Sequence, residues 1–180
     1  MAVETTHIFL DRLYEEMLPK MLSWRNDIRI RKWCRQNDII DEIHHKEWYE
    51  NQSKDESIRM YSIMATGATT GKKDPDVIGI CGLTDIDLIN QRAEFSIYVG
   101  PEFGGNNYGE LALKLLCANA FDSYPLHTVW GEVFDGNPAL EVFKKIGFKV
   151  DGIRRDFYFR EGKFLDAYLI SIKRGALIND

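Results

Sequence analysis

The chain has 180 residues, of which 44% are hydrophobic and 28% are charged, and its net charge is −5. These values are typical of one ordinary globular domain and exclude a disordered or collagen-like chain. The negative charge argues against a broad surface for nucleic-acid phosphates, so we expect no nucleic-acid partner. We interpret residues 1–180 as a single domain.

The cellular context follows from the apolar segments and the cysteines. No apolar run approaches the roughly 20 residues that a membrane-spanning helix needs. The N-terminal residues have neither the cationic stretch nor the apolar core of a signal peptide. The three cysteines, Cys34, Cys81 and Cys117, are far apart, and their odd number does not fit a disulfide framework. We therefore expect a cytoplasmic protein with reduced thiols and no membrane contact.

The N-terminal part of the chain predicts a strand followed by helices. Residues 7–13 alternate apolar and polar side chains, as a half-buried strand does. Two glutamates then precede Pro19, and both features suit the first turn of a helix. A second, short helix is expected over residues 28–35, and Asp41 can cap a third.

Three strands are expected next, and they read as an antiparallel meander over residues 58–65, 77–83 and 93–99. Residues 67–76, rich in Gly, Thr, Lys and Asp, form a turn cluster. The glycines of the middle strand indicate a bulge or a close approach of a neighbouring backbone.

After residue 100 the pattern switches to alternating helices and strands. A Gly/Asn loop precedes an almost wholly apolar segment, which predicts a buried helix. A strand, a helix ending at Gly147 and a hairpin around Glu161-Gly162 complete the chain. The expected ranges are 101–108 for the loop, 109–121, 128–134 and 138–146 for the next three elements, and 153–159 and 164–172 for the hairpin. The fold class is therefore α/β, with a mixed, mostly antiparallel central sheet of six to seven strands and flanking helices.

The loop before the apolar helix carries the clearest chemical signal. A helix N-terminus leaves backbone N–H groups unpaired, and its dipole favours negative charge. Small residues and asparagines before it let the backbone wrap a phosphate. A diphosphate can thus sit against the amides of residues 103–109, although a tight strand-to-helix turn explains the same residues equally well. Neither Gly-Lys-Ser/Thr nor G-x-G-x-x-G is present, which excludes the two better-known phosphate loops.

From residue 94 to residue 172 the sequence resembles the core of the GNAT acetyltransferases, closest in style to ribosomal-protein N-terminal alanine acetyltransferases and aminosugar acetyltransferases. The loop PEFGGNNYGELAL resembles the family's acetyl-CoA diphosphate loop, GNPALEVFKKIGF its later helix, and RRDFYFREGKFLDAYLISI its closing hairpin. The N-terminal LPKMLSWRNDIRIRKW is similar to the Trp-Arg-Asn-Asp stretch of the aminosugar branch. The order and spacing of these motifs carry the resemblance.

Four positions depart from the pattern of the family. Gly104 stands where an Arg or Gln is usual in the loop, and Asn107 where a Gly is usual. Phe143 replaces a tyrosine that serves many relatives as general acid, and a phenylalanine has no proton to donate. Asn137, whose counterpart bonds to the cofactor, lies about one residue nearer to position 143 than usual.

The resemblance implies direct transfer of an acetyl group from acetyl-CoA, a cosubstrate, to a primary amine without a metal. A backbone N–H between Ile97 and Val99 would polarise the thioester carbonyl. Glu94 is the candidate general base, and its alternative role is a solvated ion pair with a cation such as Arg92. Without a tyrosine at position 143, the thiolate would take its proton from Tyr98, which we assign, or from Tyr108, Tyr158 or water. The resemblance assigns cofactor binding to Ile97, Val99, Phe103, Gly104, Gly105, Asn106, Asn107, Tyr108, Gly109, Asn137 and Phe143.

Substrate recognition is expected on the N-terminal helices, where tryptophans and charged residues cluster. Arginine can pair with a carboxylate or phosphate and tryptophan can stack on a sugar or base, but core tryptophans among solvated charges explain the cluster as well. The candidate substrate-binding residues are Trp24, Arg25, Asn26, Arg29 and Trp33. The adjacent His44 and His45 diverge on a helix, so we expect no zinc site, and only Cys34 with His44 suggests a nucleophilic pair.

For the acceptor we favour a small-molecule amine such as an aminosugar nucleotide. The alternatives are a peptide N-terminus as the acceptor, or a non-catalytic acyl-CoA-binding module, which the loss of the usual loop Arg and of the tyrosine would explain. We expect a monomer or a homodimer.

Overall fold

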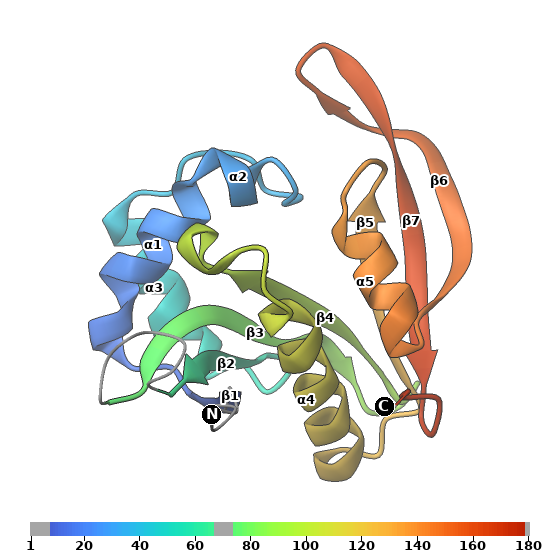
Figure 1. Cartoon of the computed structure of the whole chain (residues 1–180), viewed down its shortest axis with the longest axis horizontal. Helices are drawn as coiled ribbons and strands as arrows, with labels where there is room; N and C mark the ends of the chain where they lie inside the picture. The colour runs from blue at the N-terminus through green and yellow to red at the C-terminus, as the bar shows by residue number, and fades with distance from the viewer. Residues whose placement is uncertain (1–7, 67–73, 179–180) are drawn as a thin grey trace, which may run out of the picture.

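The computed structural model describes residues 8–66 and 74–178, and its strands form one seven-stranded sheet (Figure 1). The order across the sheet is β1-β2-β3-β4-β5-β7-β6, and only the β4–β5 pair is parallel. This confirms the mixed, mostly antiparallel sheet. The strands are β1 (Ile8–Arg12), β2 (Arg59–Ala65), β3 (Asp76–Asp87), β4 (Arg92–Val99), β5 (Thr128–Phe134), β6 (Lys149–Arg160) and β7 (Lys163–Lys173).

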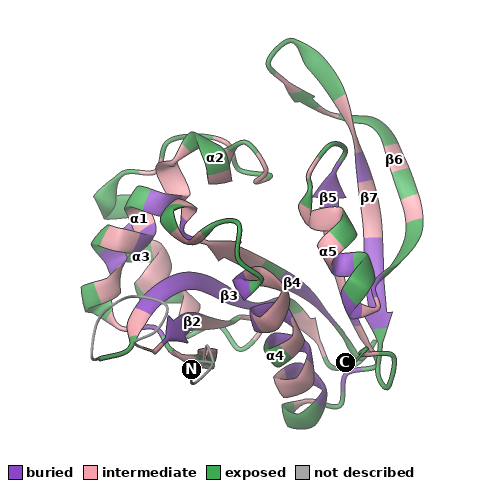
Figure 2. Cartoon of the chain, viewed as in Figure 1, coloured by how far each residue is buried: buried purple, intermediate pink, exposed green. Residues whose placement is uncertain are grey.

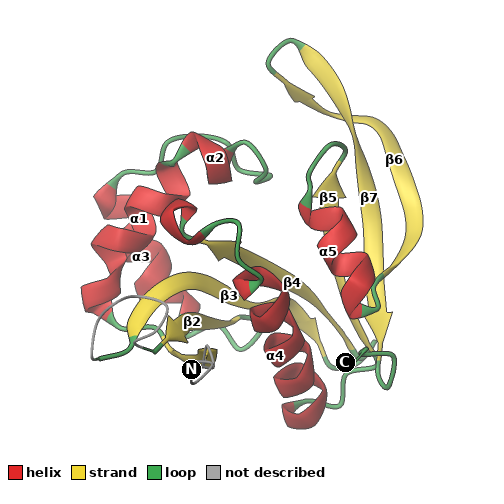
Figure 3. Ribbon diagram, in the orientation of Figure 1, coloured by secondary structure: helices red, strands yellow, loops and turns green. Residues whose placement is uncertain are grey.

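Helices cover both faces of the sheet (Figure 3). Two of them, α4 and α5, share a hydrophobic core with one face, whereas α1 and α3 pack on the other face against β2 and β3. Within residues 8–66 and 74–178, no helix has both the length and the apolar character needed to cross a membrane. The helices are α1 (Leu18–Asn26), α2 (Ile28–Arg31), α3 (Glu42–Gln52), α4 (Tyr108–Ser123) and α5 (Ala139–Ile146), with 3-10 turns η1 (Glu15–Met17) and η2 (Pro101–Phe103).

Some elements differ in extent from the sequence-based expectation. The short helix expected over residues 28–35 ends at Arg31, because the N–H groups of Trp33 and Cys34 bond to carbonyls three residues back and tighten the turn. The closing hairpin begins earlier than expected, at Lys149, since β6 pairs with β7 along its length except at two register shifts. Position 7 of the expected first strand and residues 67–73 of the expected turn cluster lie outside the described residues.

The apolar helix α4 is buried on one side rather than all round. Ala112, Leu113 and Leu116 are fully enclosed against the sheet, whereas Leu115 is 39% exposed. Figure 2 shows the buried residues of α4 where it meets the sheet, residues of intermediate burial along its outer side, and exposed residues at its C-terminal end. In the described part of the chain no second layer packs outside α4. The helix therefore covers one face of the sheet and leaves its own outer side towards solvent.

The glycines of β3 mark close backbone approaches, as the sequence indicated. A Cβ atom on Gly79 would lie 2.5 Å from the Tyr98 carbonyl oxygen of β4. On the other side, a Cβ atom on Gly82 would lie 2.5 Å from the Arg59 carbonyl oxygen of β2. These glycines let β3 sit tightly between its two neighbours.

The parallel strands β4 and β5 pair only at their beginning. Their register runs from Arg92 and Thr128 to Glu94 and Trp130 and then stops. The next residue, Phe95, packs its ring on Gly131 of β5, where a Cβ atom would overlap that ring. The ring of Phe95 also contacts Phe143 and Phe148, with centroid separations of 5.2 and 5.0 Å. This aromatic cluster fills the space between the strands and accompanies their divergence in Figure 1.

The contact between Phe95 and Gly131 yields a stability prediction. Gly131→Ala should lower the free energy of unfolding by about 1–3 kcal/mol, because the added methyl group overlaps the ring of Phe95 and displaces it from its contacts with Phe143 and Phe148. Chemical denaturation and calorimetry would measure the loss, with a melting temperature lower by roughly 2–4 °C per kcal/mol.

Two variants control this experiment. Gly152→Ala in β6 adds the same methyl group where no atom lies within 4 Å, and should be nearly neutral. Phe95→Leu should reduce the effect of Gly131→Ala in a double-mutant cycle. Equal losses for Gly131→Ala in both backgrounds would contradict the contact.

Candidate active site

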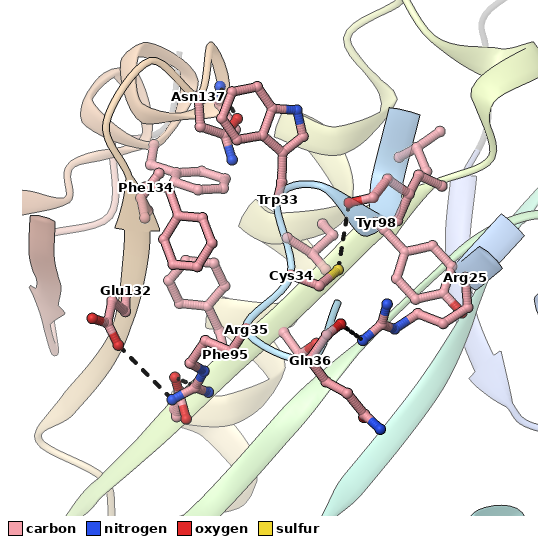
Figure 4. Close-up of a pocket in the computed structure, with 18 of the residues that line it drawn as sticks. Arg25, Trp33, Cys34, Arg35, Gln36, Phe95, Tyr98, Glu132, Phe134 and Asn137 are labelled. Carbon is pink, nitrogen blue, oxygen red and sulfur yellow. Dashed lines mark hydrogen bonds and ion pairs between the residues drawn. The ribbon is translucent and has the colours of Figure 1, made fainter. Parts of the chain in front are cut away.

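A cavity of about 470 Å³ opens where β4 and β5 separate. Its walls come from the segment around α2, from β4 beyond its paired start, and from β5 with the start of α5 (Figure 4). The cavity brings together many residues that the sequence nominated for different roles. They are Arg25, Arg29, Trp33, Glu94, Ile97, Tyr98, Val99, Asn137 and Phe143.

Two carboxylates lie in this cavity and share one guanidinium group. Oε1 of Glu94, on β4, is 2.6 Å from Nη2 of Arg35. Oε2 of Glu132, on β5, is 4.0 Å from Nη1 of the same arginine. The side chains of the two glutamates are 10% and 1% exposed. Arg35 therefore compensates two enclosed negative charges that face each other across the strand separation.

The β6–β7 hairpin supports this ion-pair cluster from the other side. The hydroxyl of Tyr158 donates a hydrogen bond of 3.1 Å to Glu132, and Nη1 of Arg154 lies 3.4 Å from both carboxylate oxygens. Nη2 of Arg160 donates to the backbone carbonyl oxygen of Arg35 at 2.6 Å. The hairpin thus fixes both Glu132 and the segment that carries Arg35.

Two further polar groups of the cavity are protonated at neutral pH. Burial raises the pKa of the Tyr98 hydroxyl, and burial also raises the pKa of the Cys34 thiol. The thiol of Cys34 donates to the carbonyl oxygen of Ile30 at 3.5 Å, whereas the ring of His44 bonds to Asp41 at 2.6 Å. Since each has a different partner, the structure does not assemble Cys34 and His44 as a nucleophilic pair.

The predicted phosphate loop leads from β4 into α4. Gly105 has φ +83°, a left-handed conformation that glycine adopts without strain. The N-cap residue of α4, Asn107, makes no side-chain hydrogen bond to the first turn in the described structure. The backbone hydrogen bonds of the helix begin with Leu111 N–H to the Asn107 carbonyl, so the preceding amides point out of the N-terminus. These amides are suitable donors to an anion.

The predicted phosphate loop lies next to the cavity, because a residue at the start of α4 is close to a residue that lines the cavity. A Cβ atom on Gly109 would lie 3.8 Å from the side chain of Val99, which lines the cavity. Phe103, Gly104, Gly105, Asn106, Asn107, Tyr108 and Gly109 themselves lie outside the cavity lining. Tyr108 is 8% exposed and belongs to the core, so only its backbone remains available for a ligand. The side chain of Asn137 accepts a hydrogen bond from Ala139 N–H at 3.0 Å, which leaves its amide nitrogen for the cavity.

Two of the nominated substrate-binding residues lie outside the lining of the cavity and contact other parts of the chain. Trp24 is 4% exposed, and its indole N–H donates to the carboxylate of Glu102 at 2.9 and 3.0 Å. The absence of a side chain at Gly100 makes room for the Trp24 ring. Asn26 forms two hydrogen bonds with the backbone of Ile40, at 2.8 and 2.9 Å. Trp24 thus holds the β4–α4 loop to α1, and Asn26 closes the segment that contains α2.

Sequence reasoning missed Glu132 and Arg35. Glu132 is the only charged residue in the strand TVWGEVF, and a lone carboxylate in a buried strand is a signal that could have been used. Arg35 had no such signal, because its partners lie 59 and 97 positions further along the chain. Among the described residues, no group of three His, Cys, Asp or Glu side chains is arranged to hold a metal ion.

A second cavity of about 420 Å³ adjoins the first. The two cavities share five lining residues, Arg25, Gln36, Thr84, Ser96 and Tyr98. The far wall of the second cavity is formed by α3, where the rings of His45 and Trp48 stack with centroids 5.5 Å apart.

The adjacent histidines of α3 differ in their environments. His44 is exposed, and its hydrogen bond to Asp41 raises its pKa above the ordinary value of 6.5. His45 is only 6% exposed, and burial followed by the charge of Arg25 lowers its pKa below 6.5. At neutral pH His45 is therefore an uncharged imidazole.

The acetyltransferase (GNAT) domain family matches residues 7–149 of the chain. Among curated proteins, an uncharacterized N-acetyltransferase of Bacillus licheniformis is 29% identical over 102 residues, which cover 56% of this chain and 57% of that protein. The spermidine N(1)-acetyltransferase of Escherichia coli is 26% identical over 125 residues, which cover 69% of this chain and 63% of that protein. The chain thus spans about three fifths of the length of these relatives.

Solved structures of spermidine N-acetyltransferase from Vibrio cholerae have a similar fold. The structure in complex with CoA and spermine superposes with a TM-score of 0.85 at 21% identity, covering 96% of this chain and 98% of the other. A structure described as dodecameric and in an intermediate state gives a TM-score of 0.75 at 20% identity, with coverages of 93% and 94%. At such identities the likeness concerns the fold.

The two histidines provide a direct test of the electrostatics of the second cavity. An NMR titration of the imidazole signals should give a pKa above 6.5 for His44 and below 6.5 for His45. Because His45 binds its proton more weakly in the folded than in the unfolded chain, its contribution should lower stability as pH falls from about 6.5. His45→Gln assigns the signal, and a His45 pKa at or above that of His44 would contradict the burial of its ring.

Proposed function

Because the chain belongs to the acetyltransferase (GNAT) domain family, we propose that it transfers an acetyl group from acetyl-CoA directly to a primary amine. The observation that carries the proposal is the separation of β4 from β5, which places Glu94 in a cavity next to the uncapped N-terminus of α4. An anion-binding helix end beside the cavity and an enclosed carboxylate within it suit a cosubstrate with a diphosphate and an acceptor that must lose a proton.

We propose that the backbone amides of residues 103–109 hold the diphosphate of acetyl-CoA. The left-handed Gly105 turns the loop, and the first turn of α4 offers amides without a side-chain cap. These features fit an anion even though Gly104 replaces the usual Arg or Gln, since main-chain donors do not depend on the side chain. Acetyl-CoA supplies the activated acyl group, and Asn137 and Phe143 would flank its pantetheine arm from the α5 side of the cavity.

The acceptor amine must reach the cavity uncharged, so a base must take its proton. Glu94 is our proposed base, because its carboxylate is enclosed on the face of β4 that Ser96 and Tyr98 share. Glu132 lies opposite and would position the ammonium group before deprotonation. Arg35 links the two carboxylates and has to yield part of its contact when the amine arrives.

Residues of β4 also suit the other two requirements of the transfer, which are a polarised thioester carbonyl and a proton for the leaving thiolate. Beyond Glu94 the strand no longer pairs with β5, so a backbone N–H between Ile97 and Val99 can polarise the thioester carbonyl. Tyr98 is our proposed proton donor to the leaving thiolate. Of the three tyrosines considered, Tyr98 lines the cavity, whereas Tyr108 is in the core and Tyr158 donates to Glu132.

For the acceptor we propose a small-molecule primary amine. The aminosugar nucleotide that the sequence favoured is an anion, whereas spermidine, after which relatives from Escherichia coli and Vibrio cholerae are named, is a polycation. A peptide N-terminus is the third acceptor class. The monomer or homodimer expected from the sequence stays a prediction, and light scattering would distinguish it from the dodecamer described for spermidine N-acetyltransferase of Vibrio cholerae.

A non-catalytic acyl-CoA-binding module is the second candidate function, and one observation favours it. Phe143 is 8% exposed and packs edge-on against Phe95, so no hydroxyl group is available at this position. Binding of CoA without turnover across a panel of amines would establish this alternative.

The phosphate loop can be tested with two substitutions at one position. Gly109→Pro removes one amide donor in the first helical turn, where proline is tolerated, and should weaken CoA binding about 10- to 100-fold. Gly109→Ala keeps the amide and fits the space, with its Cβ atom 3.8 Å from Val99, so its affinity should stay near that of the unmodified chain. Isothermal calorimetry measures both. Equal affinities for the two variants would contradict backbone binding at this position.

The proposed base can be tested separately from cofactor binding. Glu94→Gln should lower kcat about 10²- to 10⁴-fold at pH 7, because it removes the proton acceptor, and should leave CoA affinity unchanged. Thiol release from acetyl-CoA provides the rate. Glu141→Gln, at an exposed glutamate of α5, is the matched control. A large loss for Glu132→Gln with normal rates for Glu94→Gln would move the base to β5.

A further inference from the structure

The charges around the two adjoining cavities do not suit a polycationic acceptor. The first cavity holds the carboxylates of Glu94 and Glu132, but these already face Arg35. Arg25 and Arg29 line the same cavity, and Arg29 is paired with the carboxylate of Asp27 at 2.7 Å. The described lining of the second cavity contains Arg25 and two histidines and no carboxylate. A second or third ammonium group of a substrate would therefore lie near Arg25, and the lining carboxylates already face another arginine.

Two residues that line the second cavity each carry a buried nitrogen atom without a hydrogen-bond partner in the described part of the chain. His45 is 6% exposed, and its Nε2 atom has no hydrogen-bond partner among the described residues. The same holds for Nη1 of Arg25, although Nη2 of that residue donates to the Gln36 carbonyl at 3.0 Å. Buried polar groups are normally paired, so two such atoms around one cavity indicate a ligand that completes their hydrogen bonds.

We propose that the second cavity binds an oxyanion, a carboxylate or phosphate, carried by the acceptor amine. This inference rests on the proposed acetyltransferase function and specifies its acceptor class. Arg25 supplies a fixed positive charge with fork-like donors, and His45 supplies an additional N–H. The indole of Trp48 and the ring of Tyr98 provide apolar walls for the intervening carbon chain.

The geometry along β4 sets the length of such an acceptor. Glu94 in the first cavity and Ser96, shared by both cavities, lie on the same face two residues apart, which is roughly 7 Å in a strand. An amine at Glu94 and an oxyanion in the second cavity are thus joined by a short chain of a few carbon atoms. The lowered pKa of His45, caused by burial and then by Arg25, agrees with a pocket whose positive charge is not yet compensated.

The test compares matched acceptors in a thiol-release assay. The carboxylate arm uses β-alanine and γ-aminobutyrate against their amides, the phosphate arm uses O-phosphoethanolamine against ethanolamine, and spermidine is the polycation. We expect at least one oxyanion-bearing acceptor to have kcat/KM about tenfold or more above its neutral partner and above spermidine, mainly through KM. The arm with the larger ratio identifies the anion.

Substitutions at the second cavity then test whether this preference for oxyanion-bearing acceptors arises there. Arg25→Gln should abolish the preference for the oxyanion by raising KM, while the rates with the neutral partners change little. Lys46→Gln removes a positive charge from the exposed side of α3 next to His45 and should leave the preference unchanged. A similar loss for charged and neutral acceptors in Arg25→Gln would show a structural role and overturn the inference.

Failure of the inference is distinguishable from failure of the proposed function. Turnover with spermidine or the neutral amines at rates equal to or above those of the oxyanions would overturn the acceptor class and leave the acetyltransferase function intact. If no amine is acetylated, the NMR signal of His45 tests whether the second cavity binds the oxyanion. A rise of its pKa on adding β-alanine, γ-aminobutyrate or O-phosphoethanolamine supports the site, and an unchanged signal with all three overturns it.

Discussion

The ring of Phe95 against the bare backbone of Gly131 is the contact on which the site depends. A parallel pair of strands normally continues its hydrogen bonds, and β4 and β5 begin to do so. One residue after the last pair, an aromatic ring occupies the space above Gly131 and is itself held by Phe143 and Phe148. The strands therefore diverge at a defined residue, and the two halves of the sheet enclose a cavity instead of a continuous surface.

The alternation of side chains along β4 gives the two sides of this cavity different chemistry. Phe95, Ile97 and Val99 belong to the core below α4, next to the helix N-terminus that can hold an anion. Glu94 faces the opposite way, where Arg35 and Glu132 complete a cluster of charges. One strand can thus present backbone donors to a cosubstrate and a carboxylate to an acceptor, because neighbouring residues of a strand point to opposite faces.

The β6–β7 hairpin ties the C-terminal part of the chain to this cluster. Tyr158 and Arg154 hold Glu132, and Arg160 bonds to the backbone of Arg35, 125 positions earlier in the sequence. Arg35 lies in the segment that Asn26 closes through Ile40. The position of the guanidinium between two glutamates is therefore set by contacts from both ends of the chain, and the wall of the second cavity depends on the same segment.

By itself the sequence determined the order of strands and helices, the mostly antiparallel sheet, the loop that leads into α4 and the place of Glu94 on a strand. These features follow from local patterns: alternation, capping residues and glycines act within a few neighbours. The same patterns predicted a substrate-binding role for both Trp24 and Arg25. Only the tertiary structure showed that the ring of Trp24 packs in the core against Gly100, whereas Arg25 lines both cavities. The pairing of Arg35 with Glu94 and Glu132, and the second cavity around His45, were also decided by the fold. Their partners come from distant segments, and no local periodicity records which side chains a sheet will bring together.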